Sequence, residues 1–237
     1  MLSVPVFRFT FTSSWKMLCL TLIGMAIFIR LGFWQLHREA EKRQLLQAYH
    51  SQMNRQAVNF PGVEVQQYQS VIVRGHYLPM VLLLDNQHHD HHFGYDVLSV
   101  LLLDNGEAIV VDRGWVAADP ARVSFPKVSI PSHAVEVRGR VYFPSTKQWV
   151  LGPTWEKKTN HFAIVETLDT SMLSQFLHKS LYPFIIRQSK DTKGDYMRDW
   201  AIVSTAPERH RGYALQWFMF AAVLGIIYIG LNLKKTR

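Results

Sequence analysis

The C-terminal end of the chain contains an uncharged segment long enough to cross a lipid bilayer. From Tyr213 to Leu233 there are 21 residues without a charged side chain. As a helix rising ~1.5 Å per residue, this segment covers the roughly 30 Å hydrocarbon core of a membrane. Basic residues follow it, and Tyr213 and Trp217 lie at its start, where aromatic rings favour the membrane interface. The pattern predicts a transmembrane helix over residues 212–233.

A second apolar segment lies near the N-terminus. Met17 to Ile29 is apolar, Arg30 interrupts it, and apolar residues resume up to Leu36. A cleaved signal peptide would end in a site of small residues, whereas bulky residues follow here. The sequence therefore predicts a retained membrane anchor over residues 17–36, with Arg30 extending toward the interface and Trp34 at the far boundary.

Two membrane segments place both chain ends on one side of the membrane. Arg8 and Lys16 precede the first segment, and the basic tail at 234–237 follows the second. Basic residues are enriched on the cytoplasmic side, so residues 1–16 and 234–237 are predicted to be cytoplasmic. Residues 37–211 then form a domain on the opposite side.

The net charge of +8 and the pI near 9.6 raise the question of nucleic-acid binding. The basic residues are spread along the chain, and several flank the apolar segments, so orientation in the lipid bilayer explains them better. We find no known nucleic-acid-binding motif, and nucleic acid is not an expected partner. The single cysteine, Cys19, excludes an intramolecular disulfide.

The domain between the two membrane segments begins with a helical extension and continues with β-structure. Residues 37–53 carry opposite charges at helix spacing, such as Glu39 and Arg43. Short β-prone runs follow, Asn105-Gly106 indicates a hairpin, and Asp169 is an N-cap candidate for a helix over 169–178. The predicted strands are 70–78, 81–85, 95–103, 108–116, 135–143, 162–165 and 181–187. The predicted fold is an α+β membrane protein in which two transmembrane helices flank an antiparallel β-rich domain, either a barrel or a sandwich.

Three motifs, in order along the chain, carry a family resemblance. The first is Leu31-Gly-Phe-Trp-Gln35, followed by Arg38 and Lys42; the second combines Gly94-Tyr95 with Val111-Asp-Arg-Gly-Trp-Val116. The third is His210, Tyr213-Ala214 and Trp217-Phe218. With these motifs the chain resembles the Surfeit locus protein one family, membrane-anchored assembly factors for cytochrome c oxidase in bacteria and mitochondria. Asp112 departs from the family, which usually has Asn there.

The resemblance implies a chaperone in the maturation of haem-copper oxidase, one that presents or stabilises haem a as it enters the catalytic subunit. The expected partners are that subunit, the haem a synthesis machinery and the lipid bilayer. The expected location is the bacterial inner membrane with the domain on the periplasmic side, or the mitochondrial inner membrane in a eukaryote. His210 is the candidate haem ligand, since a neutral imidazole can take an axial position. Tyr213 and Trp217 would flank the ring, and Arg30, Arg209 or Arg211 would pair with its propionates.

A histidine-rich stretch supports an alternative function. His88, His89, His91 and His92 surround Asp90 in a predicted loop, and imidazole with carboxylate suits Cu or Zn. The stretch lacks tetrahedral ligand spacing, and a solvated loop with weak metal affinity is the competing interpretation. A copper-handling protein therefore remains the second hypothesis.

A cofactor-free scaffold for oxidase subunits is the third hypothesis. Its predicted interaction surface combines Trp34, Gln35 and Arg38 of the first motif with Arg113 and Trp115 of the second, because Arg and Trp are frequent in binding hot spots. The structural alternative places Gly114 at a bulge or a close backbone approach, pairs Arg113 with Asp112 or another carboxylate, and puts Trp115 in the core.

Signatures of enzymes are missing from the sequence. There is no phosphate-binding glycine loop, no Gly-x-Ser-x-Gly elbow and no His-Glu-x-x-His zinc helix. We therefore expect that the protein is not an enzyme.

Overall fold

The computed structural model describes residues 2–6, 9–145, 155–159, 161–190 and 196–235. The chain divides into two compact units, which we describe separately. One unit combines residues 1–47 with residues 202–237, and the other comprises residues 48–201.

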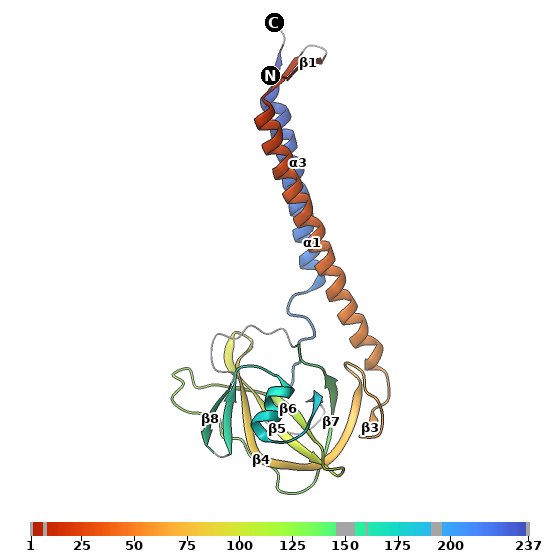
Figure 1. Ribbon diagram of the computed structural model, residues 1–237, viewed down its shortest axis with the longest axis vertical. Helices are drawn as coiled ribbons and strands as arrows, with labels where there is room; N and C mark the ends of the chain where they lie inside the picture. Colours follow the sequence, from red (N-terminus) through yellow and green to blue (C-terminus); the bar gives the residue numbers. More distant parts are fainter. Residues whose placement is uncertain (1, 7–8, 146–154, 160, 191–195, 236–237) are drawn as a thin grey trace. The chain divides into compact units, whose positions relative to one another are not determined.

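The first unit is built on two long helices that lie side by side (Figure 1). Helix α1 is Trp15–Met53 and helix α3 is Pro207–Asn232. Four of the five buried residues of α3 recur every seven positions, at Pro207, Ala214, Ala221 and Tyr228, and the fifth is Asn232. This is the heptad spacing of packed helix pairs, in which small residues bring the backbones close together. The remaining faces of both helices expose large apolar side chains.

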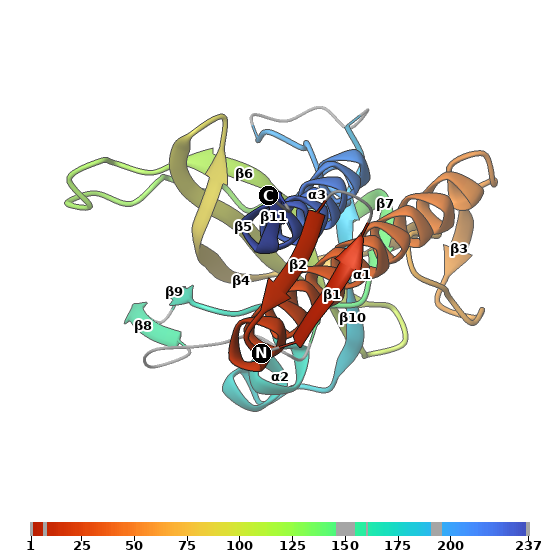
Figure 2. The same cartoon turned by 90° about the horizontal axis from the view of Figure 1, so that it is seen from above.

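A small antiparallel sheet and a polar contact join the two chain ends of this unit. Its strands, β1 (Leu2–Val6), β2 (Phe9–Ser13) and β11 (Leu233–Lys235), pair in the order β1-β2-β11. The hydroxyl of Tyr228 donates to Ser13 Oγ over 2.8 Å. Both ends of the chain therefore lie together, as the prediction for two membrane segments requires (Figures 1 and 2).

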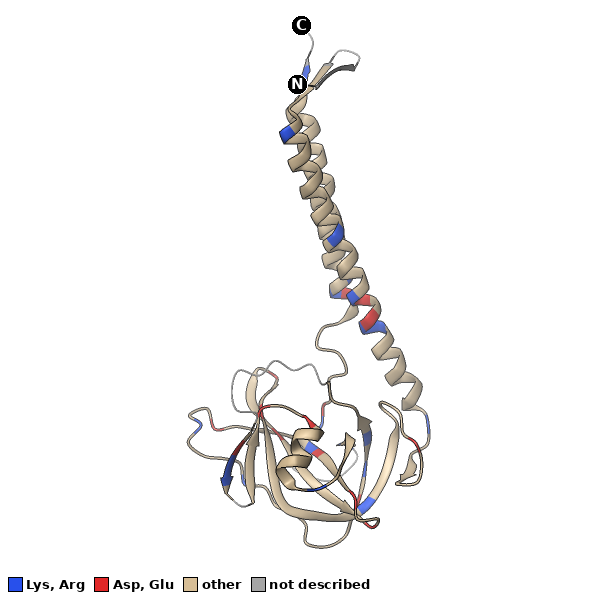
Figure 3. Cartoon of the chain, in the orientation of Figure 1, with Lys and Arg blue, Asp and Glu red and all other residues tan. Residues whose placement is uncertain are grey.

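Both helices are long and apolar enough to cross a membrane. Only 11% of the most apolar window of each helix is buried, so neither is a core helix of the kind found in soluble proteins. Charged residues are sparse along the apolar stretch and gather at residues 38–43 of α1 and in the first turns of α3 (Figure 3). These features indicate a membrane protein. The boundaries 17–36 and 212–233 stay predictions, and Arg8 and Arg237, used above for the orientation, lie outside the described residues.

The second unit is a small β-barrel. Its ring consists of β4 (Ser70–His89), β5 (His92–Leu103), β6 (Ala108–Ala117), β10 (Leu181–Gln188) and β7 (Val135–Tyr142). The order β4-β5-β6-β10-β7 closes because β7 also pairs with β4. Closure removes unpaired strand edges from this ring, as in five-stranded Greek-key barrels of the OB type.

The β-rich domain is thus confirmed, and it is a barrel rather than a sandwich. The sheet is mixed, since β6 pairs with β10 in parallel. Two further parallel pairs extend it from β4, with β3 (Val58–Phe60) and with β9 (Phe162–Val165). Strand β8 (Trp155–Thr159) pairs antiparallel with β9.

Pro79 does not divide the predicted strands 70–78 and 81–85, which form the single strand β4. The pairing with β5 shifts register between Tyr77 and Val81, so Pro79 lies in the irregular part of the ladder. A residue without an N–H is tolerated at such a bulge because no ladder hydrogen bond is lost. The hairpin predicted at Asn105-Gly106 is confirmed between β5 and β6, and Gly106 has φ +84°.

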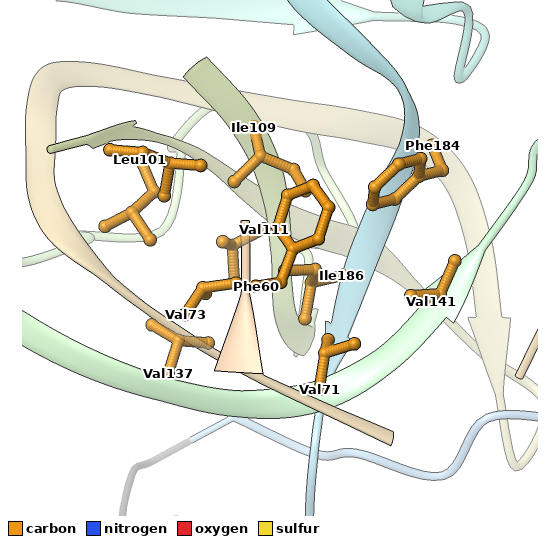
Figure 4. Packing of buried hydrophobic residues seen from close by; sticks show 11 residues of the cluster. Phe60, Val71, Val73, Leu101, Ile109, Val111, Val137, Val141, Phe184 and Ile186 are labelled. Atoms are coloured by element: carbon orange, nitrogen blue, oxygen red, sulfur yellow. The ribbon is translucent and has the colours of Figure 1, made fainter. Parts of the chain in front are cut away.

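The described residues form three apolar clusters, of which the two largest lie on opposite faces of the strands and a smaller one contains Val81, Leu83, Tyr95 and Val97. The barrel interior contains side chains from all five strands of the ring, together with Phe60 of β3 (Figure 4). The other face of β5, β6 and β10 packs against β9 and helix α2 (Thr170–Leu177). Asp169 caps this helix, as predicted, by accepting hydrogen bonds from the backbone N–H groups of Ser171 and Met172.

Candidate functional site

The first and third sequence motifs meet in the helix pair. Gln35 of α1 and His210 of α3 lie 175 residues apart in sequence, and Gln35 Oε1 is 2.8 Å from His210 Nδ1. An amide oxygen can only accept, so with this amide orientation His210 Nδ1 carries the proton. The opposite ring nitrogen, Nε2, is buried and has no hydrogen-bond partner. The contact therefore leaves Nε2 as the ring nitrogen that is available to a ligand.

A glycine in the first motif sets how closely the helices approach beside this pair. A Cβ atom at Gly32 would lie 2.5 Å from Cε1 of Phe218. The ring of Phe33 also meets that of Phe218, with centroids 5.4 Å apart. Because positions 32 and 218 lie within about two turns of Gln35 and His210, the close approach helps to hold the Gln35–His210 hydrogen bond.

The aromatic residues of the third motif differ in their contacts and exposure. Trp217 stacks on Phe28 with centroids 5.8 Å apart and an interplanar angle of 24°, and it also contacts Phe220. Tyr213 is 46% exposed, and Trp34 of the first motif is 53% exposed. The structure therefore brings Gln35 to His210, places Trp217 in the helix packing, and leaves Tyr213 and Trp34 on the outer surface.

A layer of charged residues follows the Gln35–His210 pair along the helices. Glu39 is 9% exposed and accepts a hydrogen bond from Arg43 Nε over 3.0 Å. Arg43 also lies 3.7 Å from Glu208 of α3. Arg38 pairs with Glu41 over 2.6 Å, so it is held along its own helix. Arg30, Arg209 and Arg211 are exposed.

The donor set decides which kind of ligand this site suits. Within the described residues, no three His, Cys, Asp or Glu side chains come together as a metal site. A protein that contributes a single imidazole suits a metal whose other ligands come from elsewhere, as in a haem macrocycle. Histidine ligands usually donate the N–H of their second ring nitrogen to an oxygen acceptor, and Gln35 Oε1 is that acceptor here. The residues therefore fit a haem axial ligand.

The histidine-rich stretch lies in a strand hairpin and not in a loop. His88 and His89 belong to β4, His92 begins β5, and Asp90 and His91 form the turn with positive φ. Neighbouring residues of a strand point to opposite faces, so His88 and His89 diverge. His89 contacts Trp115, whereas His88 contacts Phe93.

Gly114 of the second motif lies where two backbone segments approach each other closely. Gly114 has φ +127°, and a Cβ atom there would lie 2.7 Å from the carbonyl oxygen of Met197. The structural interpretation of this glycine is thus confirmed. Gly94 has a similar role, since its Cβ would lie 2.4 Å from Cε2 of Trp115.

Arg113 and Trp115 have separate surroundings. Arg113 donates to the carbonyl oxygen of Ser129 over 2.9 Å and lies over the rings of Tyr77 and Tyr196. The expected pairing of Arg113 with a carboxylate is therefore wrong for the part of the chain that the structure describes, because carbonyl and aromatic partners surround the guanidinium. Trp115 is half-buried and donates to the carbonyl oxygen of Gln87 over 3.2 Å.

Sequence reasoning missed two features of these sites. Gln35 was predicted to be a surface residue, although its seven-residue spacing from Phe28 is a heptad signal for the helix interface. Asp96 was not predicted to belong to any site. Its position inside an apolar strand pattern is a signal of a buried polar site, because acidic residues are rarely buried without a partner.

Comparison with known proteins identifies the family. The profile of the SURF1 family matches residues 22–222, a range that includes the barrel and most of both long helices. A SURF1-like protein of Rickettsia bellii (strain RML369-C) is 30% identical over 215 residues, covering 87% of each chain. SURF1-like proteins of Rickettsia conorii (strain ATCC VR-613 / Malish 7) and Rickettsia felis (strain ATCC VR-1525 / URRWXCal2) are 29% and 30% identical, covering 89% and 88% of this chain and 88% and 93% of their own. The chain therefore belongs to the SURF1 family.

Proposed function

We propose that this protein is an assembly factor for haem-copper cytochrome c oxidase that holds haem a through His210 during its delivery to the catalytic subunit. Membership of the SURF1 family is consistent with a role in oxidase assembly. The observation that carries the finer proposal is the buried, unpartnered Nε2 of His210 opposite the Gln35 contact.

The residues around His210 have distinct tasks in this proposal. Gln35 holds the proton on Nδ1 and fixes the ring orientation, so that Nε2 is the nitrogen offered to the iron. Haem a, the cargo, supplies an iron with an open axial position. Trp217 and the exposed Tyr213 provide aromatic surface on α3, and the exposed Arg30, Arg209 and Arg211 are the candidate partners for propionate groups.

The membrane setting completes the proposal. The two apolar helices would anchor the chain in the bacterial inner membrane, with the barrel on the periplasmic side, or in the mitochondrial inner membrane of a eukaryote. Partners in this setting are the catalytic subunit, the haem a synthesis machinery and the lipid bilayer. The role is that of a chaperone, which binds and releases its cargo without converting it.

An absorption spectrum tests the proposal directly. The detergent-purified protein, co-expressed with the haem a biosynthetic enzymes, should show a haem band that His210→Ala weakens by at least tenfold. His37→Ala is the matched control, because His37 lies on the same helix pair, is 73% exposed and contacts only Glu41 among the described residues. Equal haem content in the wild-type and His210→Ala proteins would contradict the proposal.

The same preparation separates the remaining hypotheses. A colourless protein that still co-purifies with oxidase subunits would identify a scaffold, in which Trp34, Gln35, Arg38, Arg113 and Trp115 are the first contacts to test. A copper role would require tight, stoichiometric binding that disappears when His88, His89, His91 and His92 are replaced. The diverging side chains of the hairpin give this second outcome no support.

A further inference from the structure

The barrel unit contains a small polar cavity. It has a volume of about 180 Å³, roughly that of six water molecules in the liquid. This is below the usual range for drug-sized ligands, so haem or a nucleotide would not fit. The cavity is large enough for a small organic group or the end of a side chain. It lies where the β4–β5 hairpin, β6, β10 and the segment Met197–Ala201 meet.

Three charged residues lie side by side beneath this cavity, on adjacent strands. In the register of β5, β6 and β10, Asp112 is opposite Leu98 and beside Arg187. Asp96 lies two residues from Leu98, across a register shift in the β5–β6 ladder, and is paired with Trp115. Leu98 belongs to the apolar core under α2, so apolar packing excludes water from one side of the charged row.

One carboxylate of this row, that of Asp96, lacks a partner among the described residues, whereas Asp112 accepts a hydrogen bond from the backbone N–H of Gly114 through Oδ1. Asp96 is 8% exposed and lines the cavity, and no hydrogen bond or ion pair joins its side chain to another described residue. Asp112 is fully buried, and its Oδ2 atom has no hydrogen bond. The Nε atom of Arg187 lies 3.8 Å from that oxygen, which is too long for a hydrogen bond. Buried carboxylates normally have hydrogen-bonded partners, so a polar group is missing here.

The charged residues around the cavity indicate whether a bound ligand would be a cation or an anion. Among the described residues that line the cavity, Arg187 is the one Arg or Lys, and it faces two buried carboxyl groups. Asp199 at the rim is already neutralised by Lys190, with Nζ and Oδ1 2.6 Å apart. Burial raises the pKa of Asp96 to about 6, because the single guanidinium compensates it only in part.

Aromatic walls indicate that an organic cation fits better than a metal ion. Trp115 and Trp200 line the cavity, and their indole N–H groups donate to the carbonyl oxygens of Gln87 and Gln188. These hydrogen bonds fix the rings, while the Arg187 guanidinium lies over the Trp200 ring, 5.2 Å from its centroid, and His89 contacts Trp115. Indole faces attract ammonium and guanidinium groups. A metal ion would need several ligands, and the described residues provide no such group.

We propose that this cavity is a binding site for an alkylammonium group, which pairs with Asp96 between the walls formed by Trp115 and Trp200. The group belongs either to a small free amine or to the lysine side chain of a partner protein. The site is separate from His210 and does not depend on the haem proposal.

Thermal unfolding of the full-length protein in detergent tests this site. n-Butylammonium chloride, compared with NaCl at equal ionic strength, should raise the unfolding midpoint saturably, by roughly 2–4 °C at about ten times the dissociation constant. Asp96→Asn should abolish the rise, because a neutral amide cannot pair with the cation. Asp104→Asn is the matched control, since Asp104 is exposed at the other end of β5 and should keep the rise.

A second ligand distinguishes the two sources of the amine. If Nα-acetyl-lysine N-methylamide raises the midpoint as n-butylammonium does, the cavity accepts a lysine side chain of a partner. If only n-butylammonium acts, the ligand is a small free amine. The proposal is overturned if the wild-type midpoint rises no more than it does in NaCl, or if Asp96→Asn retains the full rise.

Discussion

Gln35 Oε1 lies 2.8 Å from His210 Nδ1, and this contact determines which nitrogen of the histidine is free. The two residues come from motifs at opposite ends of the sequence, and only the packing of α1 against α3 brings them together. With Nδ1 protonated, Nε2 is left as a buried atom without a partner. The first prediction concerns this relationship.

Replacing Gln35 should change how haem is held without removing the histidine. Gln35→Leu removes the acceptor for Nδ1, so we expect about 10–100-fold weaker haem binding, the usual effect of losing such a partner. Gln35→Glu should retain binding and shift the haem spectrum, because a carboxylate acceptor increases the basicity of the imidazole. Gln216→Leu is the matched control, since Gln216 is exposed on α3. Identical haem affinity in the Gln35→Leu and wild-type proteins would show that Gln35 has no positioning role.

Two glycines of the helix pair should respond in opposite ways to alanine. Gly32→Ala brings a Cβ to 2.5 Å from the ring of Phe218, and overpacking of this kind costs about 1–3 kcal/mol. Gly212→Ala meets nothing within 4 Å and should stabilise α3 by up to about 1 kcal/mol through helix propensity. Unfolding midpoints in detergent compare the two variants. Equal midpoints would argue against close helix packing at Gly32.

Asp96 should make stability fall as the pH rises. Burial raises its pKa from 3.8 to about 6, so between these values the folded state holds a proton that the unfolded state releases. The contribution is fully present below about pH 4 and lost above about pH 6, and it is of order 3 kcal/mol. Asp96→Asn removes this dependence, so the variant should gain stability relative to the wild-type protein between pH 4 and pH 7. Unfolding curves measured across this pH range test the assignment, with Asp104→Asn as the control. If the free energies of unfolding of the wild-type and Asp96→Asn proteins changed equally with pH, the assignment would be contradicted.

The N-cap of α2 should contribute measurably to the barrel unit. Asp169 accepts hydrogen bonds from the N–H groups of Ser171 and Met172, so Asp169→Ala should destabilise the fold by about 1 kcal/mol. Asp169→Asn keeps an acceptor and should lose much less. A chemical unfolding series measures both variants, and equal losses would mean that charge, and not capping, is the property that matters at this position.

Much of the architecture was predictable because local patterns determine it. Apolar stretches of about 20 residues, the first of them interrupted by Arg30, specify the two long helices, and Asn105-Gly106 specifies the β5–β6 hairpin. The N-cap of α2 follows from Asp169 in the same way. Barrel closure was not predictable, since the parallel β6–β10 pair joins strands about 70 residues apart, and no local pattern encodes such a partner.

The sequence by itself determined the two membrane-length helices, the β-rich domain and the family. These follow from hydrophobic length, alternation and motif order, which are properties of neighbouring residues. Only the tertiary structure decided that Gln35 accepts a hydrogen bond from His210. It also decided that the side chains of the histidine-rich stretch diverge because the stretch forms a strand hairpin, and that Asp96, Asp112 and Arg187 come together on adjacent strands. The physical reason is that hydrogen bonding and desolvation act between atoms a few ångströms apart, and distant segments reach that separation only when the chain packs.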